Sequence, residues 1–335
     1  MTNSIFLQAF EGKNKQVPVW FMRQAGRFLP EYRAIKEKYS LSEMFTTPEI
    51  AAKVTCLPVE ILGVDAAILF ADILTLPSRM GFHIKFLNKE GPVIENLIQS
   101  HEDVERIHNF DNLDYVKDTI SIVRHDLPEN IPLIGFAGSP FTVLCYLLEG
   151  GSNVSFTKTF RFIQDHESAF HKLMKKLTVN TIDYLNLQKE AGIQAFQIFD
   201  TWAGILRAED YQRLILPYAK EIFANIDLPS IYYVKNCCHL LELMDKTSAN
   251  FLSVCHTVKL GENPVLKKTK KGVQGNLFPG LLYADEKILE KEVKTILTNA
   301  KKYQKYIFNL SHGILPDVEV EKVKFVVDLV HKFKR

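Results

Sequence analysis

The sequence has almost no excess of charge of either sign and no long apolar run. Its 41 lysines and arginines against 39 aspartates and glutamates give a formal net charge of +2. A nucleic-acid-binding protein would need a basic stripe, so this balance argues against that class. No uninterrupted apolar segment approaches membrane-spanning length. The segment Met1–Lys15 has no basic stretch followed by an apolar core, so we expect neither a secretory leader nor membrane association.

Cysteines are few and are spaced unlike those of a disulfide framework. The five are Cys56, Cys145, Cys237, Cys238 and Cys255. Their number is odd, and their spacing is not that of a four-cysteine zinc site. Reduced thiols in a cytoplasmic protein are the simplest interpretation. The groups Cys237-Cys238-His239 and Cys255-His256 lack the spacers of usual zinc ligands, so we expect no metal.

Three motifs for cofactors or catalysis are also absent. The sequence has no P-loop, no Gly-x-Gly-x-x-Gly after a strand and no Gly-x-Ser-x-Gly turn. It therefore gives no support for a nucleotide cofactor or for serine hydrolysis. The basic cluster Lys267–Lys271 is predicted to be a solvated loop.

Hydrophobic residues are plentiful, at 47% of the 335 residues, and they form short runs that alternate with longer amphipathic segments. The eight candidate strands are Val17–Met22, Ala66–Ala71, Pro132–Ala137, Ala195–Phe199, Ser230–Val234, Phe251–Val254, Gly272–Gly275 and Tyr306–Leu310. Helical patterns between them include Pro48–Leu62, Phe141–Leu148, Phe156–Glu190, Ala208–Asn225 and Asp285–Lys302. This alternation predicts right-handed βαβ units and a parallel sheet. Eight units favour one α/β domain over residues 1–335, a closed (β/α)₈ barrel of TIM type, rather than an open doubly wound sheet.

Such a barrel carries its chemistry at the carboxyl ends of its strands. Polar or glycine-flanked groups follow every predicted strand: Arg23 and Arg27, Asp72, Gly138-Ser139-Pro140, Asp200-Thr201-Trp202, Lys235-Asn236, Cys255-His256, Asn276, and Ser311-His312-Gly313. The candidate site is therefore predicted at this end of the barrel.

The segment Phe21–Pro30 places two arginines four residues apart around Gly26. A guanidinium is always charged, planar and forked, so it matches a carboxylate through two parallel hydrogen bonds. Gly26 allows the backbone to approach a ligand closely or to adopt a positive φ. The pattern indicates a carboxylate clamp at Arg23 and Arg27, with a solvated turn as the alternative.

Asp72 lies in an apolar segment, where burial of a lone acid is costly. One interpretation is a structural acid, either a helix N-cap or a paired acid of the core. The other is a carboxylate that faces a cation or N–H donors and that nearby arginines keep ionised. His312, between small residues at a strand end, can face a ligand or be structural. Tyr146 is either a core residue or a residue close to a ligand. The Glu-Gly-Gly that ends its helix favours a loop near a ligand. Asp200 and Thr201 are interpreted as N-cap residues.

Several of these segments resemble, in order, the signatures of the uroporphyrinogen decarboxylase family. Pro18–Tyr32 resembles the N-terminal signature, and Phe70–Leu74 resembles the second. The resemblance continues through Gly135–Thr142, Tyr146–Gly151, Gln197–Gly204, Gln274–Leu277 and Asn309–Pro316. It therefore covers nearly the whole chain.

The resemblance implies a cytoplasmic homodimer of (β/α)₈ barrels in heme and porphyrin biosynthesis. The family is a carboxy-lyase that removes carbon dioxide from the four acetate side chains of uroporphyrinogen III, giving coproporphyrinogen III, with no metal and no organic cofactor. It implies that Asp72 and Arg23 are catalytic. It implies substrate binding by Arg23, Gln24, Ala25, Gly26, Arg27, Asp72, Tyr146, Thr201 and His312.

The physical chemistry of these residues suits such a substrate. Asp72 can accept hydrogen bonds from pyrrole N–H groups. Protonation of a pyrrole carbon makes a cationic ring into which the electrons of a leaving carboxylate flow. A fixed anion beside that cation contributes on the order of ~3–4 kcal/mol. Arginines would hold the acidic side chains in register. Arg23 is the hypothesised proton donor or relay, although a water or a substrate carboxyl can also deliver the proton.

The chain departs from the family pattern at Asn236, Cys255, His256, Phe278 and Ser311. None of these is an implied site residue, but they leave the wall of the site open. One alternative is therefore a catalytically weakened tetrapyrrole-binding relative. Another is a corrinoid-dependent methyltransferase of the same superfamily, which would need a zinc-binding His-x-Cys motif where Tyr233-Val234-Lys235 stands.

Overall fold

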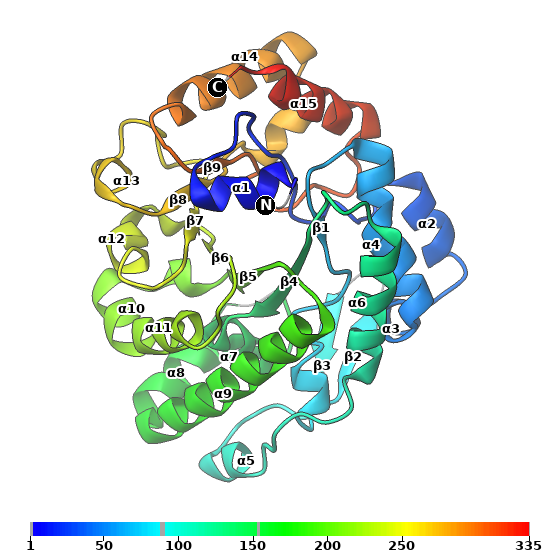
Figure 1. The fold of residues 1–335 in the computed structure, drawn as a ribbon. Coiled ribbons are helices and arrows are strands. Elements are labelled where there is room, and N and C mark those ends of the chain that lie inside the picture. Colours follow the sequence, from blue (N-terminus) through cyan, green and yellow to red (C-terminus); the bar gives the residue numbers. More distant parts are fainter. Residues whose placement is uncertain (1–2, 88–90, 153–154, 335) are drawn as a thin grey trace.

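The computed structural model describes residues 3–87, 91–152 and 155–334. Its centre is a curled, parallel sheet of seven strands in the order β1-β4-β5-β6-β7-β8-β9 (Figure 1). The strands are β1 (Ala67–Ile68), β4 (Leu133–Gly138), β5 (Ala195–Asp200), β6 (Ser230–Val234), β7 (Phe251–Ser253), β8 (Gly272–Gln274) and β9 (Tyr306–Ile307). Strands that are neighbours in the sheet follow one another along the chain, so the predicted parallel α/β arrangement is confirmed.

Helices surround this sheet on its outer side (Figure 1). They are α1 (Ile5–Glu11), α2 (Pro30–Lys36), α3 (Leu41–Thr46), α4 (Pro48–Leu62), α5 (His101–Glu105), α6 (Asp114–Asp126), α7 (Pro140–Glu149), α8 (Thr157–Asp165), α9 (Glu167–Ala191), α10 (Ala208–Leu214), α11 (Leu216–Ala224), α12 (Leu241–Met244), α13 (Pro264–Lys268), α14 (Glu286–Ala300) and α15 (Val320–Lys332). Short 3₁₀ turns are η1 (Pro77–Arg79), η2 (Ala203–Ile205), η3 (Cys237–Leu240) and η4 (Pro279–Tyr283). Among the described helices, none combines the length and apolarity needed to cross a bilayer.

The interior of the curled sheet is filled by side chains rather than open. Almost every residue of the strands is buried, as expected for parallel strands covered on both faces. The core also contains a polar layer. The indole of Trp20 donates to Gln274 Oε1 at 2.9 Å, and Gln274 Nε2 donates to Gln197 Oε1 at 2.9 Å and to Ser253 Oγ at 3.0 Å. These bonds join β5, β7 and β8 to the N-terminal segment.

The strand predicted over Val17–Met22 is not confirmed. Val19 forms one parallel bridge with Phe308, directly after β9. On the other side, the Asp65 N–H donates to the Val19 carbonyl at 2.8 Å, while the Val19 N–H donates to Asp65 Oδ2 at 2.7 Å. Because a side chain takes this N–H, and Pro18 has none, a regular ladder cannot develop. The segment nevertheless lies between the two edge strands.

Two predicted helices are each divided in two. The pattern over 156–190 becomes α8 and α9, separated at His166, where φ is −137° and ψ is 47°. The pattern over 208–225 becomes α10 and α11, separated at Ile215. Pro217 explains the second break, because it cannot donate the helical hydrogen bond and is tolerated only in a first turn. The predicted helix Pro48–Leu62 is confirmed with the same bounds.

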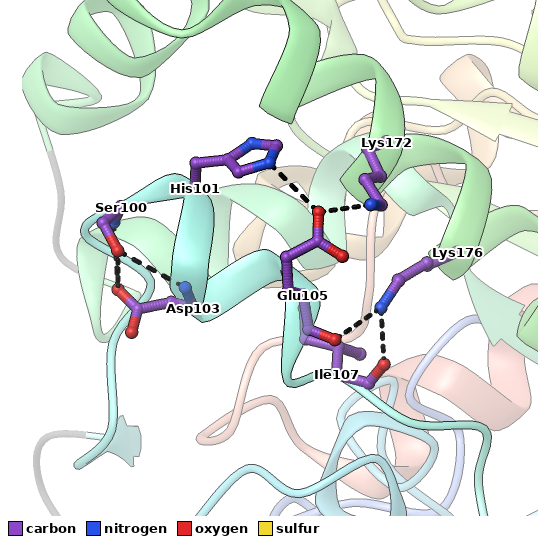
Figure 2. A network of polar contacts seen from close by, with 7 residues as sticks. All are labelled: Ser100, His101, Asp103, Glu105, Ile107, Lys172 and Lys176. Atoms are coloured by element: carbon purple, nitrogen blue, oxygen red, sulfur yellow. Dashed lines mark hydrogen bonds and ion pairs between the residues drawn. The ribbon is translucent and has the colours of Figure 1, made fainter.

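The long connection after β1 contains an antiparallel hairpin that the sequence analysis did not predict, β2 (Ile84–Leu87) with β3 (Gly91–Ile94). The same connection includes α5, which is fixed to α9 by polar contacts (Figure 2). Lys172 forms an ion pair with Glu105, and Lys176 Nζ donates to the carbonyl oxygens of Glu105 and Ile107 at 3.0 and 2.7 Å. A capping box between Ser100 and Asp103 begins the helix.

Candidate active site

The predicted site residues lie in loops, and in one case within a helix, that follow the strands of the parallel sheet. Arg23 follows the segment 17–22, Asp72 follows β1, and Tyr146 lies in α7 directly after β4. Thr201 follows β5, and His312 follows β9. Carboxyl ends of parallel strands meet at one edge of a sheet, so these elements converge.

The loop that carries the two arginines is fixed by Gln24. This side chain is fully buried, accepts from the Phe21 N–H at 3.0 Å and donates to the Ala66 carbonyl at 3.0 Å. Arg23, not Gly26, has the positive φ, at 60°. Gly26 is instead required by crowding, because a Cβ there would lie 2.8 Å from the Arg23 carbonyl oxygen. The neighbouring Ala25 is half-buried, whereas the Arg23 side chain is exposed.

Asp72 is half-buried in a tight turn. Its Oδ1 accepts from the Leu74 N–H at 2.9 Å, and its own N–H donates to Thr75 Oγ1 at 3.2 Å. Burial raises the pKa of the Asp72 carboxyl, while the Leu74 N–H and the charge of Arg23 oppose that rise. Within the described part of the chain, Oδ2 has no hydrogen-bond donor and no cation within ion-pair distance. The carboxylate therefore keeps one oxygen free to accept from a ligand.

Tyr146 shares this electrostatic environment. Burial and the charge of Asp72 raise its pKa to about 12, and the charge of Arg23 acts in the opposite direction. The hydroxyl therefore stays protonated near neutral pH. The Tyr146 ring stacks on Trp202, with ring centres 4.2 Å apart, and the half-buried Thr201 directly precedes Trp202.

His312 packs against the arginine loop. The Ile314 N–H donates to the Met22 carbonyl at 3.0 Å, and a Cβ on Gly313 would lie only 2.3 Å from Arg23 Cδ. Burial lowers the pKa of His312 to about 3, and the charges of Arg23 and Lys235 act in the same direction. The imidazole is therefore neutral near neutral pH.

Arg27 is less closely connected to this group. Its side chain is exposed, and within the described residues no acceptor or acid binds its guanidinium. Its charge acts on Tyr32, whose ring meets that of Phe70 edge-on at 5.8 Å. Phe70 lies two residues before Asp72, whereas the charge of Arg23 acts on Asp72, Tyr146 and His312, which form one cluster with it.

The N-cap interpretation of Asp200 is wrong. Its carboxylate accepts from Thr142 Oγ1 at 2.9 Å and from Tyr232 Oη at 2.8 Å, and it caps no helix. Burial raises the pKa of Asp200 to about 6, although its hydrogen bonds from Tyr232, Thr142 and Ser139 lower it. Asp200 therefore fixes the start of α7 against β5 and β6 and is a structural residue.

Three of the positions that depart from the family pattern contact one another. His256 Nδ1 lies 3.1 Å from Ser311 Oγ, and the His256 ring lies 4.6 Å from that of Phe278. Cys255 instead approaches Cys237, with 3.6 Å between the sulfur atoms. Asn236 occupies the left-handed region with a φ of 57°. The three contacting residues adjoin His312 without replacing any residue of the cluster.

Sequence reasoning missed Tyr233, which lies in β6 and contacts His312. The sequence signal available for it was the predicted strand over Ser230–Val234. A strand pattern alone does not show which of its side chains points toward His312. Among the described residues, no three histidine, cysteine, aspartate or glutamate side chains gather closely enough to hold a metal ion. Hollows of about 540 and 570 Å³ lie along α14 and between α4 and α6, away from the cluster.

Comparison with known proteins identifies relatives along the whole chain. The sequence model of the uroporphyrinogen decarboxylase family matches residues 1–333. The uroporphyrinogen decarboxylase of Trichlorobacter lovleyi is 42% identical over 340 residues, covering 99% of both chains. That of Thermodesulfovibrio yellowstonii is 43% identical over 333 residues, covering 98% of both.

Solved structures show the same fold at low sequence identity. A methyltransferase from Methanosarcina mazei has a TM-score of 0.83 at 19% identity, with all of both chains covered. A B12-independent methionine synthase from Shewanella has a TM-score of 0.62 at 9% identity, covering 84% of this chain and 86% of the other. At these identities the likeness concerns the fold alone.

Proposed function

The chain belongs to the uroporphyrinogen decarboxylase family, and from this premise we propose that it converts uroporphyrinogen III to coproporphyrinogen III, as a carboxy-lyase of porphyrin and heme biosynthesis. The reaction removes carbon dioxide from each of the four acetate side chains. The observation that carries this proposal is Asp72, whose Oδ2 is free among the described residues within a cluster of donors and cations.

The cluster supports the proposal because its two kinds of groups match the two parts of the substrate. The macrocycle presents pyrrole N–H donors at its centre, and a carboxylate such as Asp72 only accepts. Its rim carries carboxylates, and guanidinium groups such as Arg23 and Arg27 bind these in a forked geometry. We assign Tyr146, Thr201 and His312 to the remaining substrate contacts. Gln24 acts on the substrate only indirectly, by fixing the arginine loop.

The proposed chemistry begins with protonation of a pyrrole carbon. The ring becomes cationic, the carbon–carbon bond to the acetate carboxylate breaks, and its electrons neutralise the ring as carbon dioxide leaves. A second protonation, at the exocyclic carbon, then completes the methyl group, and loss of the first proton from the ring carbon restores the neutral pyrrole. Asp72 stabilises the cation, and a fixed group of this kind contributes on the order of ~3–4 kcal/mol to such a step. Arg23 holds the reacting carboxylate and positions the proton donor.

We also propose that residues 1–335 form one closed (β/α)₈ barrel, in which the segment 17–22 takes the place of an eighth strand. The hydrogen bonds of Val19 on both sides support this closure. The resemblance to the family supports a homodimer that works in the cytoplasm. Light scattering of the purified protein tests the dimer.

The experiment is an anaerobic turnover assay with uroporphyrinogen III in buffer that contains a metal chelator, with products separated by chromatography. We expect stepwise loss of carboxyl groups down to coproporphyrinogen III. In Asp72→Asn the rate should fall about 10²–10³-fold, because the side chain keeps its shape and loses its charge. Circular dichroism and thermal unfolding should stay those of a folded protein.

Asp118→Asn is the matched control. It makes the same chemical change at an exposed position on α6, away from the cluster. Its turnover should equal that of the unchanged protein. Absence of turnover in the unchanged protein would contradict the proposed activity. Normal turnover of Asp72→Asn would remove Asp72 from the mechanism.

A further inference from the structure

Tyr233 is buried at the carboxyl end of β6, with 1% of its surface exposed. It contacts His312, which lies far from it in the sequence. Its Oη lies 2.9 Å from His312 Nδ1. The two rings are nearly parallel, with 6° between their planes and 6.2 Å between their centres. A hydrogen bond and a parallel ring together fix both the position and the rotation of the imidazole.

The imidazole held in this way is neutral. Burial, followed by the charges of Arg23 and Lys235, lowers the pKa of His312 to about 3. A neutral imidazole carries one proton, on either Nδ1 or Nε2, and the partner of one nitrogen decides which. Burial also raises the pKa of Tyr233, so its hydroxyl keeps its proton and can donate.

The distances favour one direction for the Tyr233 hydroxyl. Its other acceptor is the Ser311 carbonyl oxygen at 3.4 Å, which is long for an O–H···O bond. The contact with Nδ1, at 2.9 Å, has ordinary length. A hydroxyl that donates to Nδ1 leaves the proton of the ring on Nε2. In the described part of the chain, Nε2 has no hydrogen-bond partner.

We propose that Tyr233 is a positioning residue that holds His312 in the Nε2–H tautomer, so that His312 donates a hydrogen bond to a carboxylate of the substrate. The role in substrate binding rests on the proposed function, whereas the tautomer is a property of the free protein. Asp72, which only accepts, suits the pyrrole N–H groups, and an Nε2–H donor suits a carboxylate on the rim. The hydroxyl of Tyr233 thus decides which part of the substrate His312 can bind.

The first test is ¹⁵N NMR of the histidine rings in the free, unchanged protein. The chain has ten histidines, and the signals of His312 are identified by their loss in His312→Gln. We expect the proton on Nε2 and an unprotonated Nδ1 across neutral pH. A proton on Nδ1 would overturn the proposal, and the variant serves only to assign the signals.

The second test is Tyr233→Phe, which keeps the ring and removes only the hydroxyl. The His312 signals should then report a mixture of tautomers, and KM for uroporphyrinogen III should rise about 10-fold, as expected for the loss of one hydrogen bond to a charged group. The turnover number should change much less than KM.

Tyr232→Phe is the matched control, since it removes a buried hydroxyl from the neighbouring residue, which bonds Asp200 instead. It should leave the His312 tautomer unchanged. An unchanged tautomer and KM in Tyr233→Phe would contradict the positioning role. If the unchanged protein shows the Nε2–H tautomer but no decarboxylation, the proposed function fails and the tautomer assignment stands.

Discussion

At the scale of single residues, the cluster keeps its charged groups unpaired. The charge of Arg23 opposes the rise in the pKa of Asp72, yet no ion pair within 4 Å joins the two residues among those described. A closed pair would satisfy both groups and leave little for a ligand. Among the described residues, the Arg27 guanidinium likewise has no acid or acceptor bound to it. Both signs of charge are therefore available in the cluster, as the proposed substrate, with donors at its centre and carboxylates at its rim, would require.

Arg27→Lys tests whether a forked contact is used there. A lysine keeps the charge but loses the planar, two-point geometry. We expect KM for uroporphyrinogen III to rise about 5- to 10-fold, with a smaller change in turnover number. Arg106→Lys, directly after α5 and away from the cluster, should leave both constants unchanged. An unaltered KM in Arg27→Lys would place Arg27 outside the substrate contacts.

At the scale of elements, the loops of the site depend on contacts between distant segments. The loop after β9 lies on the arginine loop through Gly313 and through the bond from Ile314 to Met22. The connection after β1 is held in a comparable way by the polar contacts between the α5 region and α9 (Figure 2). Short helices such as α5 gain little stability alone, so tertiary contacts hold them in place.

Two lysines of α9 contact the α5 region in different ways. Lys172 forms an ion pair, whereas Lys176 donates to carbonyl oxygens. Lys176→Met should lower the free energy of unfolding by about 1–2 kcal/mol, because two carbonyl oxygens, one of them at a partly buried contact, lose a charged donor. Lys172→Met should cost less, because the pair with Glu105 is exposed. Urea unfolding at neutral pH measures both. Equal losses in the two variants would contradict this distinction.

At the scale of the whole molecule, Asp65 connects the two ends of the described chain. Its Oδ2 accepts from the Val19 N–H at 2.7 Å and from His331 Nε2, in α15, at 3.0 Å. One carboxylate therefore joins the N-terminal segment, the start of β1 and the last helix. The hydrogen bond that His331 donates to Asp65 is the largest cause that raises the pKa of His331.

The stability contributed by this contact should depend on pH. Because folding raises the pKa of His331, its contribution is fully present below pH ~6.5 and is lost as the pH rises through the folded value. His331→Ala should cost on the order of ~1 kcal/mol at pH 6, after allowance for partial exposure, and less at pH 8.5. Urea unfolding at both pH values measures this. His125→Ala, at an exposed site, should change little at either pH, and an equal cost of His331→Ala at both pH values would contradict the charged contact.

The sequence by itself determined the parallel alternation of strands and helices and the segments that hold Arg23, Asp72, Tyr146 and His312. These follow from local periodicity and from short motifs, which one segment of chain contains completely. It also predicted the helix Pro48–Leu62 with its bounds.

Tertiary structure alone decided the features that join distant segments. The single bridge of Val19, the structural role of Asp200 and the contact of Tyr233 with His312 each pair residues far apart in the chain. The positive φ of Arg23 depends in the same way on the neighbours that hold its loop. Which donor meets which acceptor, and how far burial shifts a pKa, depends on surroundings that only the folded chain provides.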